Sequence, residues 1–161
     1  MSRPGFGATG ATRANWLQVR CDAAFFAFLA LLACVGPALA EVRIEASPGG
    51  SATSFLAYFE LLRRTGERVV IDGPCFSACT LVLDVLPRSR ICVTERAVLG
   101  FHAARLVDQY GEEFPSPEAT RVVAAAYPAP IRNWIRRHGG LTARPILLSG
   151  RELAAMYPLC R

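Results

Sequence analysis

Lysine is absent from this chain of 161 residues, so all eighteen of its basic side chains are arginine. Histidine is scarce and occurs only at His102 and His138, and charged residues make up 19% of the chain. The sequence contains no internal repeat and no low-complexity linker. Its arginines are scattered and form no basic stripe with interleaved aromatic residues, so we expect no nucleic-acid partner. The hydrophobic content of 52% predicts a packed core rather than disorder.

Residues 1–40 show the three parts of a secretory signal. A positive start with three arginines precedes an uncharged apolar run at residues 23–35, and Ala38-Leu39-Ala40 supplies small residues for cleavage before Glu41. The pattern predicts export to the periplasm. It leaves a single domain of residues 41–161 with fifteen arginines and twelve acids, a net charge of +3.

Two alternatives for the N-terminus remain open. An uncleaved leader would anchor the protein in the inner membrane, and this is the only membrane contact we expect. A lipoprotein attached at Cys34 is weaker, because Leu32 fits the second position of a lipobox poorly. The apolar run is short for a membrane-spanning helix, which favours the cleaved signal.

Four cysteines follow the leader: Cys75, Cys79, Cys92 and Cys160. An even number in a small exported domain predicts two disulfides, with three possible connectivities. Cys75 and Cys79 have the spacing of neighbours on one helix face, so we expect each to pair elsewhere. A zinc site is the weaker alternative, because the spacing is Cys-x3-Cys and the four residues do not form two knuckles. We therefore expect no metal and no cofactor.

Periodicity and turn residues predict an α/β domain with a parallel sheet flanked by helices. The predicted strands are 42–46, 68–72, 91–93 and 97–102. The predicted helices are 51–64, capped by Ser51 and ended by Gly66, then 77–86, and one from 118 to 137 that is interrupted at 127–130. Residues 108–117 are expected to form a loop, and Gly73-Pro74 a turn. Phe55, Phe59 and the leucines of the first helix are expected in the core, and Tyr127, Trp134 and Tyr157 are expected to pack rather than bind a ligand.

Three segments carry the chemistry. Ser47-Pro48-Gly49-Gly50 and Gly73–Cys79 each lie where a strand ends and a helix begins, and Gly100-Phe101-His102 ends a later strand. The carboxyl ends of parallel strands share one edge of a sheet, so the three segments should converge. Ser77 would be a nucleophile, with His102 as its general base. The amides of Gly50 and Ala78 would form an oxyanion hole. His138, at a helix C-terminus, is expected to have a surface role.

These motifs resemble the ClpP/crotonase-like superfamily, and in particular the ClpP serine peptidases. Ser47-Pro48-Gly49-Gly50-Ser51, Ser77 at a strand-to-helix turn, and the stretch from Arg90 to His102 match that family's pattern in order and spacing. The likeness covers residues 42–102 well. Leu148-Ser149-Gly150-Arg151-Glu152 is similar to a late family motif. The chain is also similar to small exported ClpP-like proteins with a Cys-x-Ser-Ala-Cys core, which are mostly of unassigned function.

The chain departs from the peptidases in ways that bear on activity. The family's histidine-orienting Asp has no counterpart in residues 142–146, which leaves Asp108, Glu112 or Glu113 as substitutes. Phe76 replaces a small residue and could crowd the pocket. The first strand and helix of the peptidase are lacking, which makes ring assembly doubtful, and we expect no ATPase partner because ATP is not available outside the cytoplasm.

Two functions follow. The first is an exported serine hydrolase or peptidase acting on peptides or small acyl compounds. The second is a catalytically silent ClpP-like module that binds a polypeptide or partner in the cell envelope. Acyl-CoA chemistry of the crotonase type is a distant third, because exported proteins rarely meet CoA.

Overall fold

The computed structural model describes residues 40–161, so the predicted signal, anchor or lipobox lies outside the described residues apart from Ala40. The strands are β1 (Glu41–Ile44), β2 (Arg68–Ile71), β3 (Pro74–Phe76), β4 (Ile91–Val93), β5 (Val98–Phe101), β6 (Arg105–Val107), β7 (Glu113–Pro115) and β8 (Ile146–Ser149). The α-helices are α2 (Ala52–Thr65), α3 (Val82–Val85), α4 (Pro117–Ala126), α5 (Ala129–Arg137) and α6 (Gly150–Ala154). Two 3-10 helices, η1 (Ser77–Leu81) and η2 (Arg88–Arg90), complete the domain.

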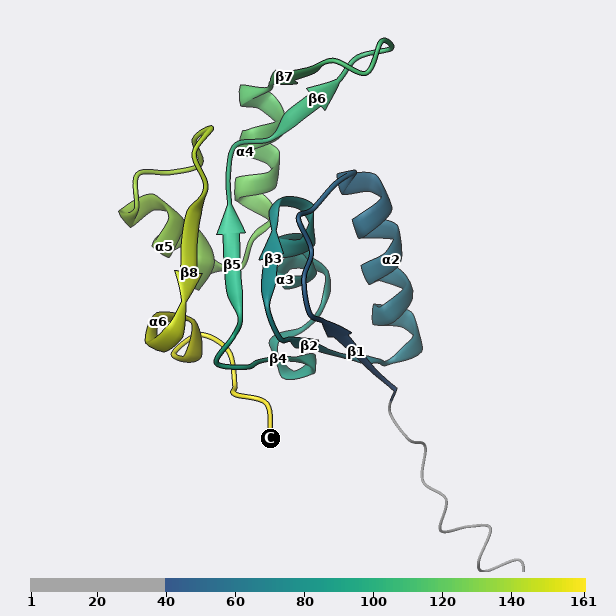
Figure 1. The fold of residues 1–161 in the computed structure, drawn as a ribbon, viewed down its shortest axis with the longest axis vertical. Helices are drawn as coiled ribbons and strands as arrows, with labels where there is room; N and C mark the ends of the chain where they lie inside the picture. Colours follow the sequence, from purple (N-terminus) through teal and green to yellow (C-terminus); the bar gives the residue numbers. More distant parts are fainter. Residues whose placement is uncertain (1–39) are drawn as a thin grey trace, which may run out of the picture. The chain divides into compact units, whose positions relative to one another are not determined.

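The strands form a small mixed α/β domain with two main sheets (Figure 1). One sheet is parallel and has the order β1-β2-β4. The other has the order β3-β5-β8, in which β3 and β5 are parallel and β8 is antiparallel to β5. The expectation of one parallel sheet is therefore confirmed only in part. The chain leaves β2, passes from the first sheet to the second and starts β3.

Gly73 and Pro74 explain this crossing. A Cβ atom on Gly73 would lie 1.9 Å from the backbone oxygen of Glu45, so only glycine fits there. Pro74 starts β3, a position where the missing N–H costs no ladder hydrogen bond. The predicted Gly73-Pro74 turn is thus confirmed only at Gly73, which lies in a bend, because Pro74 already belongs to strand β3.

Helix α2 matches its prediction closely. The Ser51 side chain accepts a hydrogen bond from the Ser54 amide at 3.4 Å, and Gly66 ends the helix in the left-handed conformation. Phe59 and Leu62 enter the core, whereas Leu56 and Leu61 are exposed. The expectation that all leucines of this helix are buried is wrong, since the helix packs on η1 and α3 with only one face.

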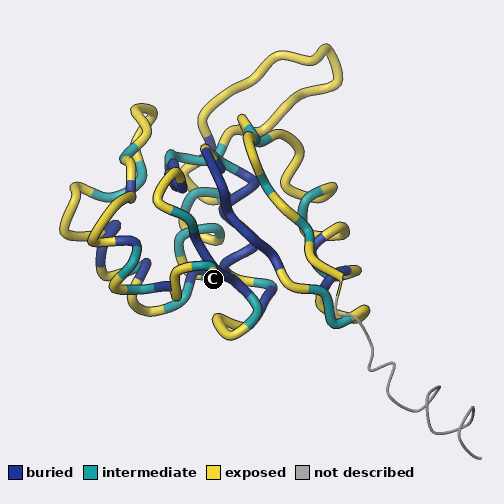
Figure 2. Tube along the Cα trace, turned by 60° about the horizontal axis from the view of Figure 1, so that its bottom comes forward, coloured by how far each residue is buried: buried dark blue, intermediate teal, exposed yellow. Residues whose placement is uncertain are grey.

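The core lies between the strands and the helices that follow them. Figure 2 shows the buried segments gathered in the central strands, while the hairpin of β6 and β7 is exposed along its length. Phe101 packs edge-on against Tyr127 with ring centroids 5.2 Å apart, and it also contacts Trp134. Tyr127, Trp134 and Tyr157 are all buried, as expected for packing residues.

Three elements differ from their prediction. The stretch expected as a loop is the turn and second strand of the antiparallel β6–β7 hairpin. Strand β8 and helix α6 follow Gly139-Gly140, where no element was predicted. The predicted 77–86 helix begins as the 3-10 helix η1 and becomes α-helical only at Val82.

Candidate active site

Ser77 stands at a sharp turn between strand β3 and helix η1. Its φ of 54° is the only positive φ of a non-glycine residue in the described chain, residues 40–161. A left-handed conformation costs a residue with a Cβ roughly 1–2 kcal/mol, so the surrounding structure must hold it. A strained serine between a strand and a helix is the arrangement that presents a nucleophilic hydroxyl in many hydrolases.

The Ser47–Gly50 turn lies directly against Ser77. The Ser47 amide donates to the Pro74 oxygen at 2.8 Å, and the Phe76 amide donates to the Ser47 oxygen at 2.9 Å, so this turn is joined to β3. A Cβ atom on Gly49 would lie 2.6 Å from the Ser77 Cβ. It would also lie 3.2 Å from the Ala78 nitrogen. Bare backbone at residue 49 is therefore what lets the two turns meet.

His102 follows the neighbouring strand β5. Phe76 pairs in register with Gly100, so Ser77 and His102 both come after the carboxyl ends of adjacent parallel strands. The His102 Nδ1 lies 2.7 Å from the Ala103 carbonyl oxygen. Because a carbonyl can only accept, Nδ1 carries the hydrogen and Nε2 holds the lone pair. That tautomer is the one that a general base uses.

One cavity of about 710 Å³ joins these groups. All four residues predicted to act in catalysis line it: Ser77, His102, Gly50 and Ala78. Its remaining wall has apolar side chains, among them Leu81, Leu106, Val107 and Val123, and polar ones, among them Ser51 and Thr53. Arg105 and Glu113 also line it, but they pair with each other at 3.0 Å. The cavity therefore combines polar and apolar surface, and it suits an uncharged group.

A pair of buried hydroxyls supports the backbone of Ser77. The Thr80 hydroxyl donates to the Ser77 carbonyl oxygen at 2.6 Å, and the Tyr127 hydroxyl lies 2.6 Å from the Thr80 oxygen. Since Thr80 has its single proton committed to Ser77, Tyr127 donates to Thr80. Burial raises the pKa of Tyr127 to about 12, so it stays protonated. Sequence reasoning missed both roles; the only local signal is a threonine three residues after Ser77.

No carboxylate orients His102 in the part of the chain that the structure describes. Glu113 is paired with Arg105, and Asp108 accepts the amides of Tyr110 and Glu112 at 2.8 and 3.0 Å within the hairpin turn. None of the three candidates named from the sequence, Asp108, Glu112 and Glu113, hydrogen-bonds to the His102 ring. The backbone carbonyl of Ala103 takes that place instead.

Phe76 does not crowd the cavity. Its ring covers Gly100 on the neighbouring strand, where a Cβ would lie 2.4 Å from the Phe76 ring. Phe76 is not among the residues that line the cavity, so that expectation from the sequence is wrong. His138 also lies elsewhere, exposed at the end of α5 and stacked on Trp134 at 4.1 Å.

The four cysteines form two disulfides, as expected, but with one pairing that the sequence argued against. Cys75 pairs with Cys79, and Cys92 pairs with Cys160. The predicted helix-face spacing does not apply, because Cys75 lies in strand β3 and the left-handed Ser77 turns the chain back between the two cysteines. Their Cα atoms come within 5.3 Å of each other.

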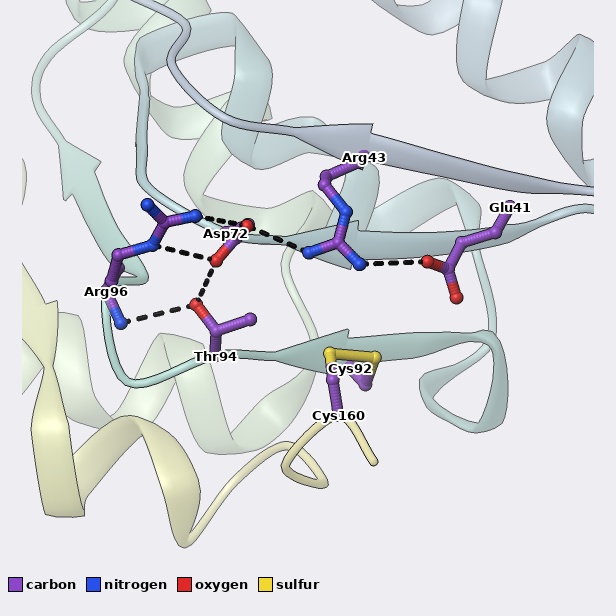
Figure 3. Close-up of polar contacts among 7 residues, drawn as sticks. All are labelled: Glu41, Arg43, Asp72, Cys92, Thr94, Arg96 and Cys160. Carbon is purple, nitrogen blue, oxygen red and sulfur yellow. Dashed lines mark hydrogen bonds and ion pairs between the residues drawn. A yellow bond between two sulfur atoms is a disulfide. The ribbon is translucent and has the colours of Figure 1, made fainter.

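The second disulfide lies beside an ion cluster in which the Asp72 carboxylate is buried and the arginines are partly exposed (Figure 3). Asp72, at the end of β2, accepts hydrogen bonds from Arg43 at 2.8 Å and from Thr94 at 2.6 Å, and Arg96 also binds it. Hydrogen bonds from Arg96, then Thr94 and Arg43, hold the Asp72 pKa well below its usual range. The cluster joins the ends of β1, β2 and β4 and contributes no residue to the Ser77 cavity, so its role is structural.

No group of three or more His, Cys, Asp or Glu side chains in residues 40–161 is placed to hold a metal ion. Within the same range, no helix is both long and apolar enough to cross a membrane.

Comparison with known proteins gives no family for the chain. No protein-family model matches it, and no curated protein matches it significantly.

Proposed function

We propose that this chain is an exported serine hydrolase of ClpP-like fold in which Ser77 is the nucleophile and His102 the general base. The observation that carries the proposal is the meeting of two turns. A left-handed serine is in contact with the bare Gly49 backbone, and both line one cavity with the His102 ring. Two disulfides agree with export to an oxidising compartment such as the periplasm.

The reaction begins when the Ser77 Oγ attacks the carbonyl carbon of an ester or amide. His102 Nε2 takes the hydroxyl proton, and the amides of Gly50 and Ala78 donate to the developing oxyanion. When the tetrahedral intermediate collapses, the imidazolium returns the proton to the leaving alkoxide or amine. A water molecule deprotonated by His102 then attacks the acyl ester, and Ser77 regains its proton.

We expect His102 to be a less effective general base than the histidine of a full Ser-His-Asp triad. A neutral carbonyl, that of Ala103, fixes the ring tautomer but supplies no negative charge to stabilise the imidazolium. Esters leave more readily than amides and demand less from the base. We therefore place small acyl esters ahead of peptides as substrates.

A binding module without catalysis is the second candidate, and one observation favours it. The β6–β7 hairpin exposes the apolar side chains of Leu106, Val107, Tyr110 and Phe114, and the first two of these line the cavity. Exposed apolar groups at a cavity rim suit the capture of an extended polypeptide in the cell envelope. The same lack of a carboxylate at His102 that slows catalysis is neutral for binding.

An alkyl fluorophosphonate separates the two candidates, because it reacts with an activated serine by displacement of fluoride from phosphorus. The full-length chain is expressed and the exported protein is tested. We expect wild type to be labelled and Ser77→Ala to remain unlabelled. His102→Ala should be labelled at least about 100-fold more slowly than wild type. Failure of the well-folded wild type to react would reject the hydrolase and leave the binding module.

A further inference from the structure

The Cys75–Cys79 disulfide encloses the candidate nucleophile. The closed loop contains only Phe76, Ser77 and Ala78 between the two cysteines. Cys75 lies in strand β3 and Cys79 in helix η1, and both side chains are fully buried. The bond thus fixes the strand to the helix across Ser77, the one non-glycine residue among residues 40–161 whose φ is positive.

A serine turn of this shape requires the residues two positions before and two positions after the serine to lie close together. In hydrolases with a Gly-x-Ser-x-Gly turn, glycines at those positions allow the strand and the helix to approach closely. Here Cys75 and Cys79 occupy them, and their Cα atoms are 5.3 Å apart. A covalent bond takes the place of the small residues and enforces the same close approach.

The bond also acts on the other half of the site. Strand β3 carries the hydrogen bonds that hold the Ser47–Gly50 turn, including the one from the Phe76 amide to Ser47. Ala78, whose amide would donate to the oxyanion, lies inside the closed loop. A change in the path of residues 75–79 would therefore move the nucleophile and the oxyanion donors together.

We propose that the Cys75–Cys79 disulfide is the positioning element of the Ser77 turn, so that the hydrolase site is assembled only in the oxidised chain. This inference rests on the proposed function, since Cys75 and Cys79 touch no substrate and act through Ser77 and Ala78. It makes activity conditional on a disulfide-forming compartment.

The second disulfide is a matched control within the same domain. Cys92–Cys160 spans 68 residues and joins the C-terminal segment to β4, where the Cys160 amide donates to the Val93 oxygen at 3.0 Å. Neither cysteine lines the cavity. By the loop-entropy argument, the longer loop stabilises the fold more than a loop that spans four residues. If both disulfides only stabilise the fold, loss of Cys92–Cys160 should therefore destabilise the protein more than loss of Cys75–Cys79.

The test compares two double variants, Cys75→Ala/Cys79→Ala and Cys92→Ala/Cys160→Ala, each exported from the full-length chain. We expect the first to lose at least about 100-fold in the rate of fluorophosphonate labelling while its thermal midpoint falls less than that of the second. The second should keep labelling within about 3-fold of wild type below its midpoint. Labelling of the first variant within about 3-fold of wild type overturns the proposal and leaves the hydrolase standing.

Amide hydrogen exchange keeps the two claims apart if the wild type does not label. In that case the hydrolase fails, and the positioning claim is judged on the amides of residues 76–80 and of Ser47, Gly49 and Gly50 alone. We expect these amides to exchange at least about 10-fold faster in Cys75→Ala/Cys79→Ala than in the control variant, since the turn opens locally. Equal exchange in the two variants overturns the positioning claim.

Reduction and reoxidation supply the rescue. In Cys92→Ala/Cys160→Ala, an excess of a small dithiol transfers two electrons and two protons to Cys75–Cys79, giving two thiols while the dithiol becomes a cyclic disulfide. Labelling should fall as the thiols form and return when oxidised glutathione restores the bond and is itself reduced to two glutathione thiols. Labelling that stays constant when mass analysis shows both thiols free contradicts the proposal.

Discussion

Replacing Gly49 by alanine probes the contact between the two turns most sharply. The backbone at residue 49 has a φ of +94°, and Gly66, at the end of α2, has a φ of +84°. A Cβ on Gly66 would meet no atom within 4 Å, whereas a Cβ on Gly49 would lie 2.6 Å from the Ser77 Cβ and 2.7 Å from the Phe76 oxygen. Gly66→Ala therefore isolates the cost of the backbone conformation, and Gly49→Ala adds the steric conflict.

The two effects have different sizes. Placing a Cβ in the left-handed region costs about 1 kcal/mol, which is the whole expected loss for Gly66→Ala. The atoms facing residue 49 belong to backbone or to a Cβ and cannot rotate away, so overpacking adds about 2 kcal/mol in Gly49→Ala. For a domain of this size, 1 kcal/mol corresponds to about 4 °C in the thermal midpoint. We expect losses of about 4 °C for Gly66→Ala and about 12 °C for Gly49→Ala.

Activity should separate the variants further. Gly49→Ala displaces Ser77 relative to the Gly50 and Ala78 amides, and a misplacement of about 1 Å can cost about 100-fold in rate. Gly66→Ala leaves the cavity untouched and should be labelled by a fluorophosphonate within about 2-fold of wild type. The assay is a labelling time course at 25 °C with a thermal melt of each variant. Equal midpoints and equal labelling of the two variants would refute the contact between the turns.

Two other predictions follow from the same structure. The pKa of Asp72 is lower in the folded state than its value of about 4 in the unfolded chain, so its carboxylate stabilises the folded state above that unfolded value and this stability is lost as the pH falls toward the folded value. The difference in thermal midpoint between wild type and Asp72→Asn should therefore shrink between pH 6 and pH 3. A constant difference contradicts the role given to the ion cluster. Tyr127→Phe removes the hydrogen bond to Thr80, so it should lower the free energy of unfolding by about 1 kcal/mol and slow labelling about 10-fold. Tyr157 is a buried tyrosine outside the cavity, and Tyr157→Phe should leave labelling unchanged in the same assay.

The convergence of the site could be predicted from the sequence because it follows from topology. Ser77 and His102 end neighbouring parallel strands, and parallel strands place their carboxyl ends at one edge. The Ser51 cap and the Gly66 stop defined α2 for a similar reason, since both are local signals. These features depend on residues that are close in sequence or on a rule of sheet geometry.

The remaining features depend on contacts that leave little trace in the sequence. The Cys75–Cys79 pairing requires the positive φ of Ser77, and no residue in the sequence indicates that backbone conformation. Tyr127 supports Ser77 through Thr80, and Thr80 and Tyr127 lie 47 residues apart in the sequence. The β6–β7 hairpin is exposed throughout, so burial imposes no pattern of alternation on it.

The central claim is that Ser77 forms an acyl-enzyme, and its most direct test is to trap that species. The protein is mixed with a p-nitrophenyl ester of a short fatty acid, quenched in acid during turnover, and digested with trypsin, which places Ser77 in the peptide Val69–Arg88. We predict an acyl adduct on Ser77 in that peptide from wild type and from Gly66→Ala, and its absence from Ser77→Ala. A wild-type protein that hydrolyses the ester with no adduct at Ser77, or that is folded and does not hydrolyse it, contradicts the claim.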